Sequence, residues 1–349
     1  MPAYEKEFQL ILDTIKLYPK QLEQSWDEVS KIELPSGYKD IQNVVFSGMG
    51  GSALGARMTD AFITENRLQV PFEIFTEFHI PDYADHSTLA IISSYSGSTE
   101  ETLNSLKMAR QKKCKIFGIT TGGKLAKFIE REKIPAYIFD PINNPSGQPR
   151  MSLGYASGAV LSILTRLGLA HIAEADIGET IEVMFSVIKE LDENVPEHNN
   201  IAKNFVKKIN GKAPVIVASE HLLGSAHALK NQFNESAKTY AMLFDLPELN
   251  HHLMEGLSHP QQLKKLIHFV FITSDLYPER VKVRYPLTAD VVKKNGVDYD
   301  IYHASAHTKL SQVYEVLVFG SFVVYYLTKS LGINPMMIPW VDYFKQKLA

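Results

Sequence analysis

The sequence predicts an α/β protein that contains two doubly wound parallel sheets. Two observations lead to this prediction: short apolar runs alternate with helical stretches, and the same pattern occurs twice along the 349 residues. The runs are continuous rather than alternating, which is typical of strands that are buried on both faces of a parallel sheet. A chain of this length is also long enough to form two domains with full cores.

The first half begins with a helical segment. Phe8, Ile11 and Ile15 recur at helical spacing, and the sequence LPSGY then ends the pattern near residue 33. Helical stretches separate the expected strands that follow, at residues 43–48, 72–75, 89–94, 114–120 and 136–139. In the flavodoxin-like order, the first and third of these strands flank the point where the strand order reverses.

The second half repeats the pattern. VVFSGMGGSALG resembles VIVASEHLLGSAHAL, and LAIISS resembles FVFITS, which indicates an internal duplication. The expected strands are residues 214–219, 240–245, 269–274 and 297–305. The predicted division of the chain is an N-terminal helical segment, a first domain, a helical connection and a second domain, at residues 1–36, 37–170, 171–210 and 211–349.

The two halves differ after their third strands. LAIISS continues as YSGSTEET, which is rich in hydroxyl groups, whereas FVFITS continues as DLYPERVK. A turn that only started a helix could have been kept in both copies. We therefore expect the first half alone to hold an anion site.

The expected anion site combines two turns at one switch point. Glycines allow a ligand to approach the backbone, and helix N-termini direct N–H groups toward an anion. The candidate phosphate-binding residues are Gly50, Gly51, Ser52, Ser94, Ser96 and Thr99. Two alternatives exist, namely a weak dinucleotide fingerprint at Gly48-x-Gly50 and a plain helix cap at Ser98 or Thr99.

Composition excludes several classes of protein. The net charge of -3 and the absence of a basic run argue against a nucleic-acid partner. Cys114 is the only cysteine, which excludes an internal disulfide and fits a reducing compartment. The N-terminus lacks the shape of a signal peptide, and the apolar stretch 313–327 indicates a buried helix because it is short and contains a Glu. We expect a cytoplasmic protein without a membrane partner.

Several ordered motifs resemble the sugar isomerase (SIS) superfamily and, more narrowly, the bifunctional phosphoglucose/phosphomannose isomerases. They are SGMGGSALG, SSYSGSTEET, PSGQPRMSLGY, NQFNESAK, LPELNHHLMEG and VDYFKQKL. The resemblance implies two SIS-type, flavodoxin-like domains with five-stranded parallel sheets. It also implies isomerisation of a hexose 6-phosphate without metal or other cofactor, in a homodimer with shared active sites.

The same resemblance assigns the catalytic residues. Glu235 matches the glutamate that acts as the base, and Arg150 matches an arginine beside the reacting carbons. His251 matches a histidine of ring opening that is supplied across a twofold interface, and Lys345 matches a lysine near the ring oxygen. Glu235 and Arg150 could instead be ordinary surface charges without a catalytic role. Lys347 is close enough in the sequence to Lys345 to be the matching lysine instead. A zinc site at His251 and its neighbour is disfavoured, because adjacent side chains point apart.

One departure from the family pattern concerns substrate choice. The family often reads Asp-Pro-Thr-Pro-Val near the C-terminus, where this chain reads Asn-Pro-Met-Met-Ile at 334–338. Methionine is bulkier than threonine and donates no strong hydrogen bond, so Met336 and Met337 leave activity on mannose 6-phosphate open. The alternatives to the hexose 6-phosphate isomerase are an isomerase of another phosphosugar and a regulatory SIS protein without catalysis.

Overall fold

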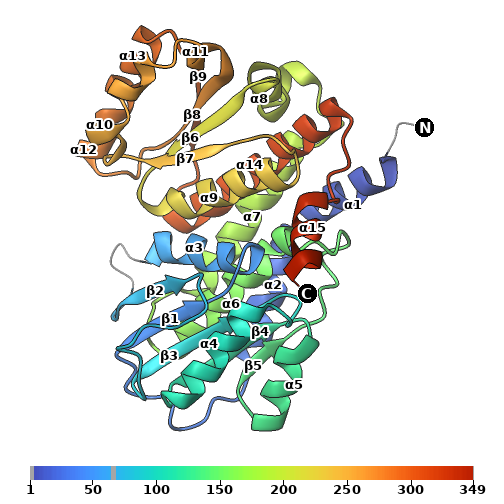
Figure 1. Ribbon diagram of the computed structural model, residues 1–349, viewed down its shortest axis with the longest axis vertical. Coiled ribbons are helices and arrows are strands. Elements are labelled where there is room, and N and C mark those ends of the chain that lie inside the picture. Colours follow the sequence, from blue (N-terminus) through green and yellow to red (C-terminus); the bar gives the residue numbers. More distant parts are fainter. Residues whose placement is uncertain (1–3, 64–67, 349) are drawn as a thin grey trace. The chain divides into compact units, whose positions relative to one another are not determined.

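The structure is a computed structural model that describes residues 4–63 and 68–348 (Figure 1). The chain forms two compact units. The first-half unit is Leu17–Glu182, and the second-half unit combines Met1–Lys16 with Val183–Ala349.

The first-half unit is built on a five-stranded parallel sheet. Its order is β2-β1-β3-β4-β5, so the order reverses between β1 and β3. The strands are β1 (Asn43–Ser47), β2 (Phe72–Phe75), β3 (Thr88–Ser93), β4 (Lys115–Thr120) and β5 (Ala136–Ile138). Every residue of β3 is buried, as expected for a central strand covered on both faces.

Helices cover both faces of this sheet (Figure 1). Val45, Ala90 and Ile92 pack against apolar residues of α4 and α5, while α3 packs closely on α6. The approach of α3 to α6 requires a glycine, because a Cβ at Gly55 would lie 2.4 Å from the Cβ of Ala156. The helices are α2 (Tyr18–Ser30), α3 (Gly51–Ile63), α4 (Glu100–Gln111), α5 (Gly123–Glu132), the short η1 (Pro149–Met151) and α6 (Leu153–Arg166), and α7 (Glu174–Leu191) leads into the second half.

The second-half unit contains a four-stranded parallel sheet. Its order, β7-β6-β8-β9, repeats the first four positions of the other sheet. The strands are β6 (Ala213–Ala218), β7 (Met242–Asp245), β8 (Ile267–Ser274) and β9 (Tyr299–Ala304).

The helix α14 (Lys309–Leu331) forms the apolar centre of this unit. It is long and apolar enough to cross a membrane, but its most apolar window is entirely buried among the other elements. The prediction of a buried helix at 313–327 is therefore confirmed. The remaining helices are α1 (Glu5–Lys16), α8 (Ile201–Ile209), α9 (Leu223–Glu235), α10 (Leu249–His252), α11 (Leu263–Leu266), α12 (Glu279–Lys282), α13 (Arg284–Lys294), α15 (Pro339–Leu348) and the short η2 (Glu197–Asn199), η3 (Glu220–Leu222) and η4 (Glu255–Ser258).

The predicted fold class is confirmed, since both units are α/β with parallel sheets in flavodoxin-like order. The prediction of five strands in each sheet is wrong for the second half, where the described residues form four. After β9 the chain enters α14 directly, so no fifth strand follows within the described residues.

The N-terminal segment also differs from a single helical region. It breaks at Leu17, and α1 belongs to the second-half unit whereas α2 belongs to the first. Pro19 lies in the first turn of α2, where its missing N–H is tolerated and where it would interrupt a continuous helix.

Candidate active site

The two predicted anion-binding turns lie side by side in the first-half unit. β1 and β3 are paired in parallel, so the turns that follow them meet at the same edge of the sheet. The backbone N–H of Tyr95 donates a hydrogen bond of 3.0 Å to the hydroxyl of Ser52, which joins the second turn to the start of α3. Six predicted residues, Gly50, Gly51, Ser52, Ser94, Ser96 and Thr99, therefore belong to adjoining turns.

The hydroxyl of Thr99 does not act as a helix cap. Thr99 occupies the N-cap position of α4, yet its side chain makes no capping hydrogen bond. Its Oγ1 instead lies 2.9 Å from the Oγ of the buried Ser94. The geometry favours a hydroxyl cluster over the plain cap considered from the sequence.

A third turn holds this cluster in shape. Gly97 has φ +63°, and a Cβ there would lie 1.8 Å from the carbonyl oxygen of Gly122. A Cβ at Gly123 would lie 2.3 Å from the carbonyl oxygen of Ser96. The turn after β4 is therefore packed directly against the turn after β3. The sequence analysis missed this support, although the Gly122-Gly123 pair is a visible signal of close approach.

Arg150 lies beside the same turns. It belongs to η1, where a Cβ on Gly51 would lie 2.7 Å from the carbonyl carbon of Pro149 and 2.8 Å from the backbone nitrogen of Arg150. The Arg150 side chain is only 2% exposed, and its guanidinium donates a hydrogen bond of 2.8 Å to Oε1 of Gln148. It is thus a buried cation on a fixed loop rather than a solvated surface charge.

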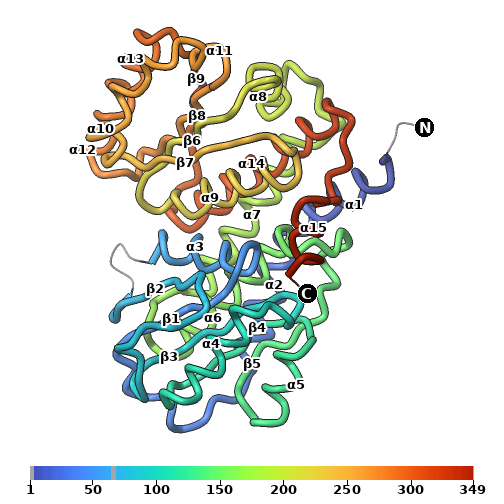
Figure 2. Tube along the Cα trace, in the orientation of Figure 1, coloured from blue at the N-terminus to red at the C-terminus, as the bar shows by residue number. Residues whose placement is uncertain are grey.

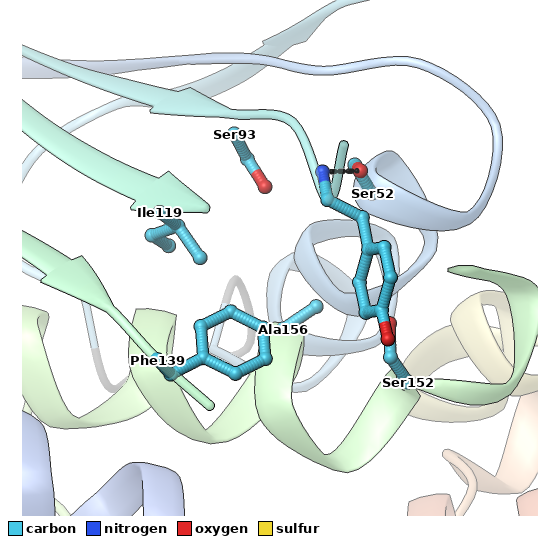
Figure 3. A pocket seen from close by; sticks show the side chains of 7 residues that line it. Ser52, Ser93, Ile119, Phe139, Ser152 and Ala156 are labelled. Carbon is cyan, nitrogen blue, oxygen red and sulfur yellow. Dashed lines mark hydrogen bonds between the residues drawn. The ribbon is translucent and has the colours of Figure 1, made fainter. Parts of the chain in front are cut away.

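Figure 3 shows a cavity between these elements. It is lined by Ser52, Ser93, Tyr95, Ile119, Phe139, Ser152 and Ala156. Ser93 and Ser152 were missed in the sequence. Ser152 had a usable signal, because it follows Arg150 closely in the motif PSGQPRMSLGY. Serine side chains and the rings of Tyr95 and Phe139 line this small cavity together.

Glu235 is the last residue of α9 in the second-half unit. The adjoining turn is tied to the C-terminal segment, because the Lys238 ammonium donates to the carbonyls of Ser236 at 3.0 Å and Asn334 at 2.7 Å. The Asn334 side chain in turn accepts hydrogen bonds from the N–H groups of Met336 and Met337. The segment that departs from the family pattern is therefore a neighbour of the turn that follows Glu235.

Glu235 and His251 lie at opposite ends of the strands of their sheet, because Glu235 precedes β7 and His251 follows it. The chain runs from β6 along α9 to Glu235 and returns through β7 to α10 (Figure 2). The Asn234 side chain bonds to the carbonyl of Ala241 just before β7, whereas Leu246 at the end of β7 bonds to Ala218 at the end of β6. Because α9 has 13 residues, its two ends lie about 20 Å apart. The exposed His251 therefore does not meet Glu235 within one chain.

Lys345 lies on α15, none of whose residues is buried. The other candidate for this role, Lys347, places its ammonium 5.8 Å from the ring centroid of Tyr343 on the same helix. Both lysines are exposed, so the structure leaves the choice between Lys345 and Lys347 open.

Metal and thiol chemistry find little support in the described part of the chain. Residues 4–63 and 68–348 contain no group of three or more His, Cys, Asp or Glu side chains that could hold a metal ion. Burial raises the pKa of the Cys114 thiol to about 11, so this side chain is a poor source of thiolate.

Fold and site together define a protein of the SIS class. Residues 198–348 match the family described as bacterial phospho-glucose isomerase C-terminal SIS domain. A crystal structure of a hypothetical protein from Thermus thermophilus superposes with a TM-score of 0.76, covering 100% of this chain and 95% of that one at 17% identity. At this identity the superposition shows the fold alone.

Sequence relatives narrow the class. The chain is 32% identical over 346 residues to a bifunctional phosphoglucose/phosphomannose isomerase of Caldicellulosiruptor bescii, which covers 97% of this chain and 99% of the relative. It is 28% identical to a protein of the same name from Thermoplasma acidophilum, over 88% of this chain and 90% of the relative. The chain belongs to the bifunctional phosphoglucose/phosphomannose isomerase family.

Proposed function

We propose that this protein is an aldose–ketose isomerase that interconverts glucose 6-phosphate and mannose 6-phosphate with fructose 6-phosphate. The observation that carries the proposal is the juxtaposition of the hydroxyl-rich turns with the buried Arg150. Such a substrate has a phosphate at one end, which the turns can bind. Its reacting carbons are at the other end, where the Arg150 cation can stabilise negative charge. Family membership supports the same reaction.

The proposed mechanism is proton transfer through an enediolate. The Glu235 carboxylate removes the proton from C2 of the open-chain aldose and returns it to C1, while the proton on O2 is lost and one is gained on O1. The Arg150 guanidinium stabilises the negative charge that develops on the enediolate oxygens. His251 assists ring opening, and Lys345 lies near the ring oxygen. The phosphate contacts supply orientation away from the reacting carbons.

A coupled assay with glucose 6-phosphate, mannose 6-phosphate and fructose 6-phosphate tests the reaction. We expect interconversion with all three, undiminished after exhaustive treatment with EDTA, because the proposed steps use side chains only. Binding without turnover would favour the regulatory alternative, and turnover of a different phosphosugar would favour the other isomerase. Loss of activity with EDTA that zinc restores would refute the proposed chemistry.

We also propose that the active enzyme is a homodimer in which His251 completes the site of its partner. The support is that Glu235 and His251 lie at opposite ends of the strands of one sheet. In a twofold dimer each surface patch meets the same patch of the partner, so a residue remote in one chain can reach the other chain's site.

Subunit complementation tests the shared site. Glu235→Gln and His251→Ala are each expected to be nearly inactive alone. When they are mixed under conditions of subunit exchange, about half of the dimers are heterodimers with one intact site, so about a quarter of wild-type activity should return. No recovery, with exchange shown independently by mass spectrometry of labelled subunits, would assign His251 to its own chain or to no catalytic role.

A cytoplasmic location is part of the proposal. Its support is the unpaired Cys114, which is typical of a reducing compartment. Fractionation of cells that express the full-length protein is the direct test.

A further inference from the structure

The buried Asn144 side chain is one of the contacts that hold the loop carrying Arg150, together with the buried Gln21, which donates to the carbonyls of Asn143 and Met151. Asn144 is only 4% exposed and forms three side-chain hydrogen bonds. Its Oδ1 accepts from the Ser146 hydroxyl at 2.7 Å, and its Nδ2 donates to the carbonyl of Gln148 at 3.1 Å. The same Nδ2 donates to the hydroxyl of Tyr95, also at 3.1 Å. The first two contacts lie within the loop, whereas the third connects the loop to Tyr95 in the turn after β3.

Tyr95 connects that loop to the anion-binding turns. Its backbone N–H donates to Ser52 at 3.0 Å, and its carbonyl accepts from the backbone and the hydroxyl of Thr121 at 3.1 and 2.7 Å. Its ring meets Phe139 edge to face at 6.2 Å. The Tyr95 hydroxyl is therefore fixed by three neighbouring elements before it meets Asn144.

The path from the phosphate turns to the cation is short and continuous. Tyr95 contacts Asn144, Asn144 holds the backbone of Gln148, and the Gln148 side chain accepts the hydrogen bond from the Arg150 guanidinium at 2.8 Å. In the proposed reaction, the phosphate on C6 and the carbons C1 and C2 lie at opposite ends of the substrate. The span between phosphate turns and Arg150 must match that length, because small misplacements of a catalytic group are costly.

We propose that Tyr95 and Asn144 are positioning residues, and that the hydrogen bond between them sets the place of Arg150 relative to the phosphate-binding turns. This inference rests on the proposed isomerase function. It concerns two residues that are linked to Arg150 through Gln148, so their effect should fall on turnover and not on phosphate affinity.

Two variants test the pair. Tyr95→Phe removes only the hydroxyl, and Asn144→Ala removes the amide. We expect Tyr95→Phe to lower kcat about tenfold, which corresponds to the ~1.4 kcal/mol of one hydrogen bond, and Asn144→Ala to lower kcat at least as much because it also removes the contacts to Gln148 and Ser146. KM and the inhibition constant of inorganic phosphate should change less than about twofold in both. The double variant should lose no more than Asn144→Ala alone, because both changes break the hydrogen bond between Tyr95 and Asn144, and Tyr95→Phe breaks no other contact of Asn144. Asn144→Leu, which is similar in size and can form none of the three hydrogen bonds, replaces Asn144→Ala if the latter folds poorly.

A matched control separates positioning from stability. Tyr38 is another partly buried tyrosine of the same unit, and its hydroxyl accepts a hydrogen bond from Ile116 N–H at 3.1 Å, near the start of β4. Tyr38→Phe should leave kcat unchanged. Unchanged kcat in Tyr95→Phe and Asn144→Ala, additive losses in the double variant, or parallel weakening of phosphate inhibition would each overturn the inference. A wild-type protein without isomerase activity would instead refute the proposed function itself.

Discussion

The switch point of the first sheet is open and lined with hydroxyl groups, whereas the switch point of the second is filled by its own side chains. After β6, the N–H of Ser219 donates to the Tyr277 hydroxyl at 3.2 Å, and the Ser219 hydroxyl lies 3.0 Å from that of Tyr285. His221 bonds to Gln312 at 2.9 Å, and Ser274 donates to the same Gln312 oxygen at 2.6 Å. All of these residues are buried.

The difference explains why we expect an anion site in only one of two units with the same strand order. In the second-half unit a tyrosine oxygen accepts the N–H of the turn after β6, the kind of group that binds anions in this fold. The two tyrosine rings stack at 5.7 Å and close the space beside it. We therefore expect the proposed phosphate contacts at the hydroxyl-rich turns of the first-half unit and not at the turns of the second-half unit.

A second contrast runs in the other direction. The helix after the first strand of the second sheet, α9, ends at Glu235, whereas the described part of α3, after the first strand of the first sheet, ends at the buried Ile63. In the proposed mechanism the two halves have different roles, since the first half carries the proposed phosphate-binding turns and the second carries the proposed base.

The largest effect should come from the base. Glu235→Gln is expected to lower kcat by at least ~10³-fold while leaving inhibition by inorganic phosphate intact, because the amide cannot accept the substrate proton. Steady-state kinetics with phosphate as competitor measure both values. Glu197→Gln, at a surface glutamate of the same unit, is the control and should be silent. Normal turnover in Glu235→Gln would mean that another carboxylate acts.

The next effect tests the shape of the open switch point. Gly97→Ala should weaken phosphate binding by roughly 100-fold, because the new Cβ would lie 1.8 Å from a backbone oxygen and must displace the turn. Gly296 is a matched control, since it has φ +76° but its nearest neighbour would be a lysine side-chain carbon at 3.5 Å. Gly296→Ala should cost only roughly 1 to 2 kcal/mol of stability and spare phosphate affinity. Calorimetric titration with phosphate distinguishes the two, and equal affinities would contradict the assigned turn.

A smaller effect belongs to the individual hydroxyls. Ser94→Ala, Ser96→Ala and Thr99→Ala should each weaken phosphate binding by roughly 1 to 3 kcal/mol per lost hydrogen bond to a charged group. Thr273→Ala and Ser274→Ala are the equivalent changes at the filled switch point. Ser274 bonds to Gln312, so its loss should appear in thermal unfolding and not in phosphate affinity. Similar phosphate affinities in both sets would end the comparison between the two switch points.

The sequence was sufficient for the fold and for the open switch point. The strands expected at 43–48, 89–94 and 214–219 lie at Asn43–Ser47, Thr88–Ser93 and Ala213–Ala218, because continuous apolar runs identify central parallel strands. Glycine and serine turns after them were equally visible.

The parts that could not be predicted depend on contacts between distant residues. Tyr277 and Ser219 are 58 positions apart, and Asn144 and Tyr95 are 49 apart. No local pattern marks a tyrosine that fills a switch point or an asparagine that spans two loops. The fifth strand expected in the second sheet is a similar case, since its absence from the described residues follows from the path of the chain into α14.

The smallest expected effect concerns acid stability and again separates the two halves. Among the described residues, the buried histidines are His221 and His268, and both lie in the second-half unit. Burial lowers the pKa of His221, and its hydrogen bond to Gln312 and the nearby Glu220 oppose this only in part. Burial likewise lowers the pKa of His268, against the opposing influence of Asp300. The Nδ1 atom of each histidine is buried without a hydrogen-bond partner, so protonation would place an unpaired N–H in the core.

These shifts fix the sign of the pH dependence. An unfolded histidine takes up a proton as the pH falls through about 6.5, while the folded protein resists, so the unfolded state binds more protons and stability is lost on acidification. We expect the free energy of unfolding in urea to fall from about pH 7 to about pH 5. The fall should be smaller in His221→Gln, which can still donate to Gln312 but does not titrate. His86→Gln, at an exposed histidine of the first-half unit, should keep the wild-type dependence. If His221→Gln loses as much stability as the wild type, the buried histidine contributes nothing to the acid sensitivity of the filled switch point.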